Sequence, residues 1–299
     1  MPTGTIIKGI GGFYYVKVEE KVFECKARGV FRKDDITPLP GDSVSISIVD
    51  AHRGTGNIVE ISERRTQLVR PSVANVDQVA VIIAVKSPAP DFVLLDKLLI
   101  TAEIKDIHPI VCINKIDLDE TGSHEEIAKA YDKAGYDVLL LNSKRHVGFE
   151  ALKERLKGKI TVFAGQSGVG KSTILNSLSQ DSRMETGEVS TKIERGRHTT
   201  RHAELFELES GGYVVDTPGF SSFELTDLPY QQLELYYPEF SDYLNKCRFT
   251  GCSHITEPEC RIKEALAEGF IDMGRYNRYI QFYNSLKQEK GYTKKKTNR

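Results

Sequence analysis

Residues 160–172 read Ile-Thr-Val-Phe-Ala-Gly-Gln-Ser-Gly-Val-Gly-Lys-Ser, and this stretch decides the fold. Its first five residues are an apolar run typical of a buried strand, and residues 171–178 have the composition of a helix. The residues between match G-x-x-x-x-G-K-[ST], in which glycines let backbone N–H groups turn inward around phosphate oxygens. The sequence therefore predicts a phosphate-binding loop between a strand and a helix N-terminus, where the helix dipole also favours an anion.

The phosphate loop supplies most of the predicted nucleotide contacts. Lys171 is expected to reach the β- and γ-phosphates, and the Ser172 hydroxyl is expected to bind Mg²⁺. A glycine-rich turn that binds nothing is the alternative. The full set of predicted contacts is Gly165, Gln166, Ser167, Gly168, Val169, Gly170, Lys171, Ser172 and Thr173.

The segments around this loop alternate between apolar runs and helix-like stretches. Apolar runs predict further buried strands at residues 76–85, 109–114, 138–142 and 213–216. Helical periodicity predicts helices at residues 91–106 and 123–134, the second with Ser123 and Glu126 as a capping box. Strands that alternate with helices are typical of a parallel α/β sheet.

Two short motifs at strand ends indicate which base is bound. In Asn114-Lys115-Ile116-Asp117, the carboxylate of Asp117 only accepts hydrogen bonds, so it suits the N1–H and 2-amino donors of guanine, which adenine lacks. The aliphatic stem of Lys115 is expected to lie along the base plane. Backbone N–H groups of the second motif are expected to reach the guanine O6. This second motif is Asn142-Ser143-Lys144. For each of the two motifs, the alternative is a solvated loop at a strand end that binds no base.

The motif Asp216-Thr217-Pro218-Gly219 follows the last predicted strand. We expect Asp216 to hold Mg²⁺ through water and the N–H of Gly219 to sense the γ-phosphate. The stretch 187–200 before it is rich in Ser, Thr, Gly and charge, as mobile loops are. Either Thr199 or Thr200 is expected to complete the Mg²⁺ coordination.

The position after Gly219 bears on the hydrolytic step. Many GTPases carry a Gln there that orients the attacking water, but this chain has Phe220, which cannot do so. His198, in the loop before the last strand, is therefore the candidate catalytic residue. A water-positioning group supplied by a partner is one alternative, and a His that only contacts a partner or solvent is another.

The first 65 residues have a different pattern. Turns rich in Gly and Pro separate five β-rich runs, at residues 5–10, 13–18, 21–27, 43–49 and 57–61. Five short strands favour a small closed barrel of the OB type, with an SH3-like barrel as the rival. The region holds ten Lys or Arg and nine Asp or Glu residues, so its composition alone does not indicate RNA binding.

From Phe223 onward the sequence is helix-like and contains a cluster of metal-binding residue types. Three cysteines and a histidine fall within 14 residues, and Cys₃His is a common tetrahedral set for structural zinc. These residues are Cys247, Cys252, His254 and Cys260, and free or buried thiols are the alternative. Cys25 and Cys112 lie in strand-like runs and are expected in the core.

The end of the chain is basic. Residues 275–299 carry eight Lys or Arg and one Glu, which gives this segment a net charge of +7. The rest of the chain has a net charge of −8. Residues 294–299 are expected to form a basic patch that attracts the phosphate groups of a nucleic acid. A frayed, solvated terminus is the alternative. Tyr276, Tyr279, Tyr283 and Leu286 lie at helical spacing, which predicts a packing face.

The overall composition is that of an ordinary globular protein. The chain has 299 residues, of which 39% are hydrophobic and 28% charged, with a net charge of −1. These values exclude bulk disorder and a uniformly basic protein, and five cysteines argue against a disulfide scaffold. Without an apolar run of about 18 residues, a signal-peptide pattern or coiled-coil heptads, we expect a cytoplasmic monomer that has no membrane partner.

The order of the motifs is unusual. In a Ras-like GTPase the phosphate loop comes first, whereas here it follows Asn114-Lys115-Ile116-Asp117, which indicates a circular permutation with an unchanged sheet. An N-terminal barrel, the permuted series NKID–GQSGVGKS–GRHTT–DTPGF and a cysteine cluster occur together. In these features the chain resembles the circularly permuted, small-ribosomal-subunit-dependent GTPases of the RsgA/YjeQ family.

This resemblance covers essentially the whole chain. It implies an OB-like β-barrel at residues 1–65, a circularly permuted α/β P-loop GTPase at 66–222 and an α-helical zinc-binding domain with a basic tail at 223–299. It implies Mg²⁺-dependent hydrolysis of GTP to GDP and phosphate, with His198 positioning the water and one structural zinc ion per chain. It also implies that the small (30S) ribosomal subunit and its 16S rRNA are the partners in late ribosome biogenesis.

Two other functions stay open on the sequence. One is a P-loop ATPase or kinase of another class, against which Asp117 argues. The other is a non-catalytic zinc and OB-type RNA-binding module with a vestigial nucleotide site. The intact Lys171, Ser172 and Asp216 argue against that second function.

Overall fold

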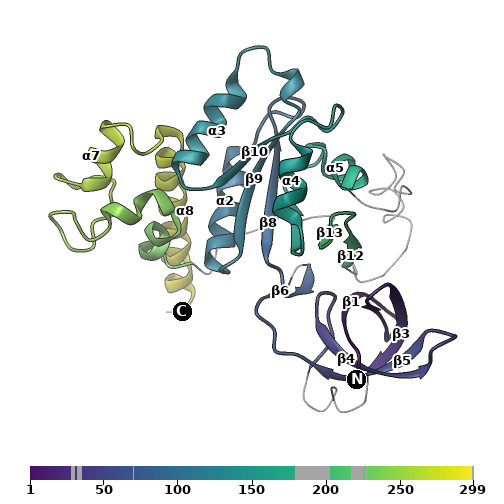
Figure 1. Cartoon of the computed structure of the whole chain (residues 1–299). Coiled ribbons are helices and arrows are strands. Elements are labelled where there is room, and N and C mark those ends of the chain that lie inside the picture. Colours follow the sequence, from purple (N-terminus) through teal and green to yellow (C-terminus); the bar gives the residue numbers. More distant parts are fainter. Residues whose placement is uncertain are drawn as a thin grey trace. The chain divides into compact units, whose positions relative to one another are not determined.

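The structure, a computed structural model, describes residues 1–27, 31, 36–69, 71–178, 203–216, 225 and 228–297; for residues 216 and 289–297 it describes the backbone alone. The chain divides into two compact units, whose elements are labelled in Figure 1. The first comprises Met1–Ala80, Phe149–Ala164 and Gly170–Phe220, and the second comprises Val81–Gly148, Gly165–Val169 and Ser221–Arg299.

The first unit begins with a closed barrel of five strands. They are β1 (Thr3–Ile10), β2 (Phe13–Val18), β3 (Lys21–Ala27), β4 (Ser43–Asp50) and β5 (Thr55–Ile61). β1 pairs with β2, β2 with β3, β3 in parallel with β5, β5 with β4, and β4 with β1, which closes the barrel. Ile6, Val16, Val44 and Ile58 are fully buried inside it. The predicted OB-like barrel is confirmed. The first and last residues of each strand lie within two residues of the predicted ends.

The remaining elements of the first unit are a short hairpin, two helices and three strands. They are β6 (Gln67–Val69), β7 (Ser72–Ala74), α4 (Phe149–Leu156), β11 (Ile160–Ala164), α5 (Lys171–Leu178), β12 (Glu204–Glu207) and β13 (Tyr213–Asp216). β11 is parallel to β13, and β12 is antiparallel to β13. The β12–β13 hairpin was not predicted as a pair, because the short sequence Glu-Leu-Phe-Glu carries little strand signal.

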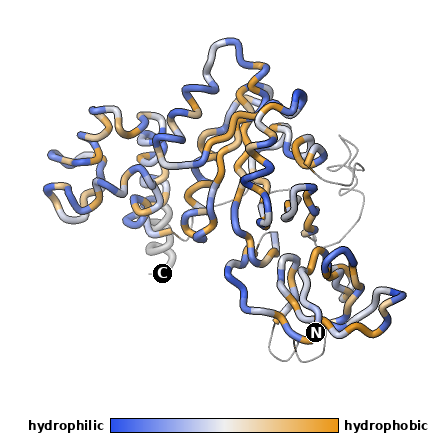
Figure 2. Tube along the Cα trace, in the orientation of Figure 1, coloured by the Kyte–Doolittle hydropathy of each residue, from blue (hydrophilic) through white to orange (hydrophobic). Residues whose placement is uncertain are grey.

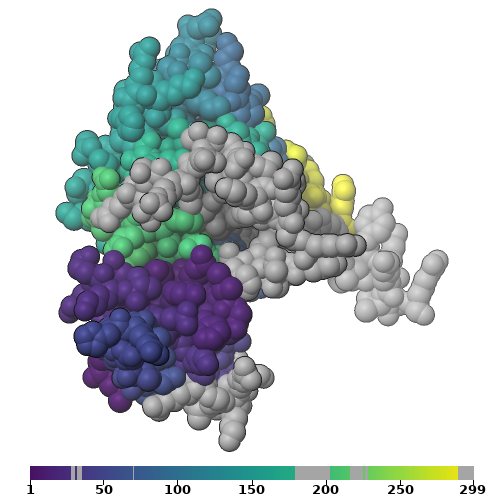
Figure 3. Space-filling view, turned by 90° about the vertical axis from the view of Figure 1, so that its right-hand side faces the viewer, coloured from purple at the N-terminus to yellow at the C-terminus, as the bar shows by residue number. Residues whose placement is uncertain are grey.

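The β12–β13 hairpin is tied to the barrel within this unit. Lys8 of β1 pairs with Glu204 of β12 along the backbone, and its Nζ lies 2.8 Å from the Glu204 carboxylate. Lys17 of β2 forms a second ion pair, 2.9 Å from Glu207. In the space-filling view of Figure 3, the green residues of the hairpin lie directly against the purple barrel.

The second unit holds three neighbouring strands, in the order β10-β9-β8. Its elements are β8 (Gln78–Ala84, whose first three residues belong to the first unit), α2 (Phe92–Ile104), β9 (His108–Asn114), the 3₁₀ turn η1 (Ile116–Leu118), α3 (Ser123–Lys133) and β10 (Asp137–Leu140). β9 and β10 are parallel, and every residue of β8 is buried. Figure 2 shows the central strands in orange, the hydrophobic end of the scale. The predicted parallel α/β sheet is confirmed.

The predicted capping box at α3 is wrong. The helix begins at Ser123 itself, with Gly122 in the left-handed conformation as the preceding cap residue, so Ser123 lies one position too late to cap it. Asp119 takes over this task, because its carboxylate accepts the N–H of His124 at 2.8 Å and contacts Nδ1 of the same residue at 2.6 Å.

The C-terminal segment packs against α2 in the second unit. It consists of the 3₁₀ turns η2 (Tyr230–Tyr236) and η3 (Pro238–Tyr243) and the helices α7 (Arg261–Ala267) and α8 (Met273–Thr297). Its hydrophobic core includes Leu233, Phe240 and Tyr279 and extends to Ile100 of α2. Figure 1 shows α8 beside α2. The predicted packing face is confirmed, since Tyr276, Tyr279, Tyr283 and Leu286 are all buried.

Within the part of the chain that the structure covers, no helix has the length and apolar character needed to cross a membrane.

Candidate nucleotide site and metal centre

Asn114, the last residue of β9, joins three of the predicted nucleotide-binding segments within the second unit. Its Nδ2 donates to the carbonyl oxygen of Val169 at 2.8 Å and to Oγ of Ser143 at 3.3 Å. Its Oδ1 accepts the N–H of Ser143 at 3.2 Å, and the whole side chain is buried. The loop after β9, the loop after β10 and the phosphate loop therefore meet at one residue.

Lys115 adds a second link to the phosphate loop. It adopts a left-handed backbone conformation with φ of 61°, and its Nζ donates to the carbonyl oxygen of Gly168 at 2.8 Å and to that of Ser87. This stretches the aliphatic stem across the site, as a platform for a flat base requires. Asp117, two residues on in η1, is exposed, so its carboxylate is accessible to a ligand.

The loop after β10 is held in shape by Asn142. Its Oδ1 accepts the N–H groups of Lys144 and Arg145, both at 3.1 Å, and its own N–H donates to the carbonyl oxygen of Val147 at 3.1 Å. Asn142 is almost fully buried, whereas Lys144 is exposed. The Asn142 side chain thus shapes the loop, in which the backbone N–H groups of Ser143 and Lys144 donate to Oδ1 of Asn114 and of Asn142.

The phosphate loop has the backbone that the sequence predicts. Gly165 has a φ of +129°, and a Cβ there would lie 2.1 Å from the carbonyl oxygen of Ile82, so only glycine fits. Gly168 and Gly170 also have positive φ, at 81° and 104°. Gln166 is half-buried, while Ser167 and Gly168 are exposed. Val169 is buried and anchors the middle of the loop.

The loop leads into α5, as predicted. The helix begins at Lys171, and the N–H of Ile174 donates to the carbonyl oxygen of Gly170 at 2.9 Å. Lys171, Ser172 and Thr173 occupy the first turn and are half-buried. The N-terminal turn of a helix favours anions, and these three residues occupy that turn.

Within the first unit, Asp216 lies at the sheet edge where β11 ends and the phosphate loop begins. Val215 of β13 pairs in parallel with Val162 of β11, so the last residues of both strands, Asp216 and Ala164, lie at the same carboxyl edge. The other predicted residues of this part lie outside the described residues; they are His198, Thr199, Thr200 and Gly219.

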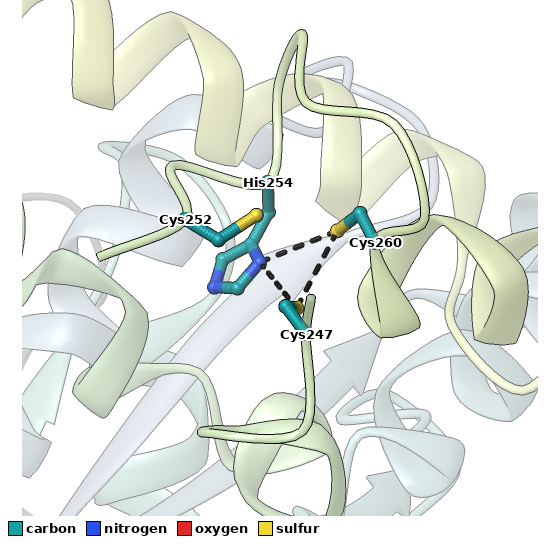
Figure 4. A group of neighbouring side chains, drawn as sticks. All are labelled: Cys247, Cys252, His254 and Cys260. Atoms are coloured by element: carbon teal, nitrogen blue, oxygen red, sulfur yellow. Dashed lines mark hydrogen bonds between the residues drawn. The ribbon is translucent and has the colours of Figure 1, made fainter. Parts of the chain in front are cut away.

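The four predicted metal ligands are brought together. Their ligand atoms all lie within 4.8 Å of one another, and Figure 4 shows the side chains converging. Nδ1 of His254 lies 3.5 Å from Sγ of Cys247 and 3.4 Å from Sγ of Cys260, and these two sulfurs are 3.9 Å apart. Around a tetrahedral zinc ion, such separations are about 3.6 Å for nitrogen to sulfur and about 3.8 Å for two sulfurs. The residues therefore fit a metal ion.

The three thiols of this cluster differ in how readily they ionise. Burial raises the pKa of Cys252 to about 12. Burial also works to raise the pKa of Cys247, but the backbone N–H of Arg261 and the thiol of Cys260 outweigh it and hold this pKa below its usual value. Three thiolates can share so small a space only when a bound cation neutralises them.

The other two cysteines are core residues, as predicted. Both side chains are buried, and burial raises the pKa of Cys25 to about 11 and that of Cys112 to about 12. These two thiols therefore stay protonated at neutral pH.

Two basic residues counted in the C-terminal excess are held in ion pairs rather than displayed on an open surface. Arg275 is fully buried and pairs with Asp96 and Glu239, and Arg278 pairs with Asp96. The side chains of residues 289–299 lie outside the described residues. The expectation of a basic patch thus rests on those last residues alone.

Two carboxylates of importance here were not singled out in the sequence. Glu234 in η2 lies 2.6 Å from Nε2 of His254, and Asp96 in α2 binds Arg275, Arg278 and the hydroxyl of Tyr131. Asp96 and Lys97 interrupt the apolar run Phe-Val-Leu-Leu-Asp-Lys-Leu-Leu-Ile, and a carboxylate in such a run is a signal of a buried charge that needs a partner. Glu234 has no comparable signal.

Comparison with known proteins agrees with this geometry. The family described as RsgA GTPase matches residues 61–226, and the RsgA N-terminal domain matches residues 3–55. A protein of Ruminiclostridium cellulolyticum named small ribosomal subunit biogenesis GTPase RsgA is 62% identical over 299 residues, which is 99% of this chain and 98% of that protein. The protein of the same name from Alkaliphilus metalliredigens is 47% identical, over 98% of this chain and its own full length.

Two solved structures are similar over nearly the whole chain. YloQ, described as a circularly permuted GTPase, has a TM-score of 0.80 and 40% identity and covers 96% of each chain. YjeQ from Thermotoga maritima has a TM-score of 0.80 and 35% identity, over 95% of this chain and 98% of its own. With its permuted motif order, five-stranded barrel and Cys₃His cluster, this chain belongs to the RsgA GTPase family, a family of GTP hydrolases.

Proposed function

We propose that this protein hydrolyses GTP to GDP and phosphate on the small (30S) ribosomal subunit in late ribosome biogenesis, and that the subunit stimulates the reaction. The relatives named above are named for the biogenesis of that subunit, and they are similar along their whole length. The observation that carries the nucleotide part is the hydrogen bond from Asn114 to Val169, because it couples the base-recognition loop to the phosphate loop.

In this proposal the phosphates lie over the first turn of α5. Lys171 neutralises the β- and γ-phosphates, and backbone N–H groups of residues 165–173 surround them. Mg²⁺, the expected cofactor, is held by Ser172 and Asp216 and by either Thr199 or Thr200. The N–H of Gly219 senses the γ-phosphate, and His198 orients the attacking water, since Phe220 cannot.

Guanine is recognised at the carboxyl end of β9. The exposed carboxylate of Asp117 accepts the N1–H and 2-amino groups, and the stem of Lys115 covers the base. A backbone N–H of Ser143 or Lys144 turns from its present acceptor, Oδ1 of Asn114 or of Asn142, to O6. An Asp117→Asn variant tests this role, because an amide N–H can donate to the 2-oxo group of xanthine. We expect at least about a tenfold loss of GTP affinity and a gain of XTP affinity.

The matched control is Glu120→Gln, an exposed carboxylate three residues away whose loss leaves the base edge untouched. Unchanged GTP affinity in Asp117→Asn would contradict the guanine assignment. ATP binding as tight as GTP binding in the wild type would favour a P-loop enzyme of another class.

One zinc ion per chain is the metal that we propose for Cys247, Cys252, His254 and Cys260. Four protein ligands leave no open position for water, so the ion is structural and stabilises the segment between η3 and α7. Metal analysis of the purified full-length chain tests this, with one zinc per chain expected. A chain that folds and contains no zinc would contradict it.

The remaining assignments concern the partner. We propose a cytoplasmic monomer with three domains: the OB-like barrel at residues 1–65, a GTPase domain at 66–222 and a zinc domain at 223–299. The barrel and the basic C-terminal end are the parts that we propose to contact 16S rRNA. Cosedimentation with purified 30S subunits tests the contact, with stoichiometric binding expected in the presence of a non-hydrolysable GTP analogue. Binding to the large subunit alone would contradict it.

A further inference from the structure

His254 faces two different groups through its two ring nitrogens. Nδ1 points to the sulfurs of Cys247 and Cys260, as the dashed lines in Figure 4 show, whereas Nε2 lies 2.6 Å from Oε2 of Glu234. The four ligands all come from residues 247–260, but Glu234 comes from η2, a separate element. The carboxylate therefore reaches the cluster from outside the loop that forms it.

The position of Glu234 decides which nitrogen is available to a metal. A neutral imidazole has one N–H and one lone pair, and only the lone pair binds a metal ion. A carboxylate at hydrogen-bond distance from Nε2 accepts a proton there, which leaves the lone pair on Nδ1, the nitrogen that faces the thiols. A metal-bound imidazole whose second nitrogen donates to a carboxylate is also a stronger ligand.

The rest of the His254 environment is built around the same orientation. The ring is buried, and it meets the ring of Phe240 edge-on with 6.1 Å between the centroids. The backbone of His254 is left-handed, with φ of 61°, a conformation that non-glycine residues rarely adopt. The hydroxyl of Tyr276 donates to its carbonyl oxygen at 2.6 Å. These contacts hold the backbone and the ring, while Glu234 is the hydrogen-bond partner of Nε2 among the residues that the structure describes.

We propose that Glu234 is a positioning residue of the metal centre: it accepts the Nε2–H of His254, fixes the tautomer and aims Nδ1 at the metal ion. This inference rests on the metal proposed above. It adds a residue of η2 to a centre whose ligands all lie between η3 and α7, so metal binding and the placement of η2 are coupled.

The test measures the affinity of the full-length chain for Zn²⁺ by competition with a chromogenic chelator, in the wild type and in Glu234→Ala and Glu234→Gln. We expect Glu234→Ala to bind zinc about 10–100-fold more weakly. The amide oxygen of Glu234→Gln still accepts the Nε2–H, so that variant is expected to recover most of the loss. Glu264→Ala and Glu264→Gln are the matched controls, because Glu264 in α7 is exposed and forms an ion pair with the exposed Arg261.

A second readout separates positioning from general stability. Long-range ¹H–¹⁵N spectra of the zinc-loaded chain are expected to show His254 protonated at Nε2 and metal-bound at Nδ1, and Glu234→Ala is expected to lose the protection of that Nε2 proton from solvent exchange. Zinc bound through Nε2, or equal zinc affinity in wild type and Glu234→Ala, would overturn the inference while leaving the metal site intact. A wild-type chain that binds no zinc would overturn both the metal proposal and this one.

Discussion

Arg275 of α8 and Asp96 of α2 form an ion pair that has no solvent exposure on either side chain, with 2.7 Å between Nη1 and Oδ1. Glu239 binds the same guanidinium in a bidentate manner, with contacts of 2.5 Å and 3.0 Å. Asp96 also binds Arg278 and accepts the hydroxyl hydrogen of Tyr131 at 2.8 Å. The pair therefore joins a helix of the GTPase region to the last helix of the chain through a buried polar network.

Aromatic rings complete the surroundings of Arg275. The rings of Tyr131, Tyr136 and Tyr237 have their centroids 5.3, 5.2 and 4.9 Å from its guanidinium carbon. A cation so completely removed from water is tolerated only when it is paired and surrounded by such groups. Because the network lies within one compact unit, α2 and α8 are expected to unfold together.

Replacement of Arg275 by Met tests this network. The change leaves the carboxylates of Asp96 and Glu239 buried without their main partner, and breaking one side of a buried pair costs about 3–5 kcal/mol. We expect a loss of that size in the free energy of unfolding from urea titrations followed by circular dichroism. Arg261→Met removes an exposed pair with Glu264 and is expected to change stability by less than about 1 kcal/mol. Equal losses in both variants would contradict a special role for Arg275.

Loss of the metal is expected to loosen the C-terminal segment. In Cys260→Ser the cluster has two thiolates and one imidazole, so zinc content is expected to fall from one per chain towards zero and Tm is expected to drop. Cys25→Ala is the control, because Cys25 is a buried barrel residue outside the cluster, and it is expected to keep a full zinc ion. Retention of zinc by Cys260→Ser would show that Cys260 is not a ligand.

Gly165→Ala is expected to damage the phosphate loop. The new Cβ would lie 2.1 Å from the carbonyl oxygen of Ile82, and the φ of +129° is itself unfavourable for alanine. The loop must shift, so we expect at least about a tenfold loss of GTP affinity. Gly122→Ala, with φ of +79° and open space around it, is the control for positive φ alone. Equal GTP affinity in the wild type and both variants would contradict a tight fit at Gly165.

His198 is expected to act in hydrolysis but not in binding. His198→Ala should bind GTP normally and lose the turnover that the ribosomal subunit stimulates, by about 10²-fold or more if the residue orients the attacking water. His108→Ala is the control, because His108 lies at the start of β9, at the opposite end of the strand from Asn114. Single-turnover hydrolysis by His198→Ala that matches the wild type would make the assignment wrong.

Local sequence patterns predicted the backbone of the phosphate loop well. A phosphate loop depends on neighbouring residues, so the glycines of residues 165–170 and the helix start at Lys171 follow directly from the sequence. The same is true of Asn114 and of the apolar strand that places it at a sheet edge. The Cys₃His cluster is also local, since its four ligands fall within one short loop.

Long-range partners explain what the sequence did not predict. Arg275 looks like part of a basic surface until Asp96, 179 residues earlier, is brought beside it. Glu234 has no local signal at all, because its role depends on how η2 folds onto residues 247–260. The capping box failed for a different reason: Ser123 and Glu126 have the right spacing, but the chain turns at Gly122 and Asp119 supplies the cap instead.

The most direct test of the account is GTP turnover by the full-length protein, with and without purified small ribosomal subunits and with ATP as competitor. We expect slow hydrolysis by the protein alone, a large increase when subunits are added and no competition from ATP. Absence of turnover under both conditions, or ATP binding as tight as GTP binding, would contradict the claim that this chain is a subunit-stimulated GTPase.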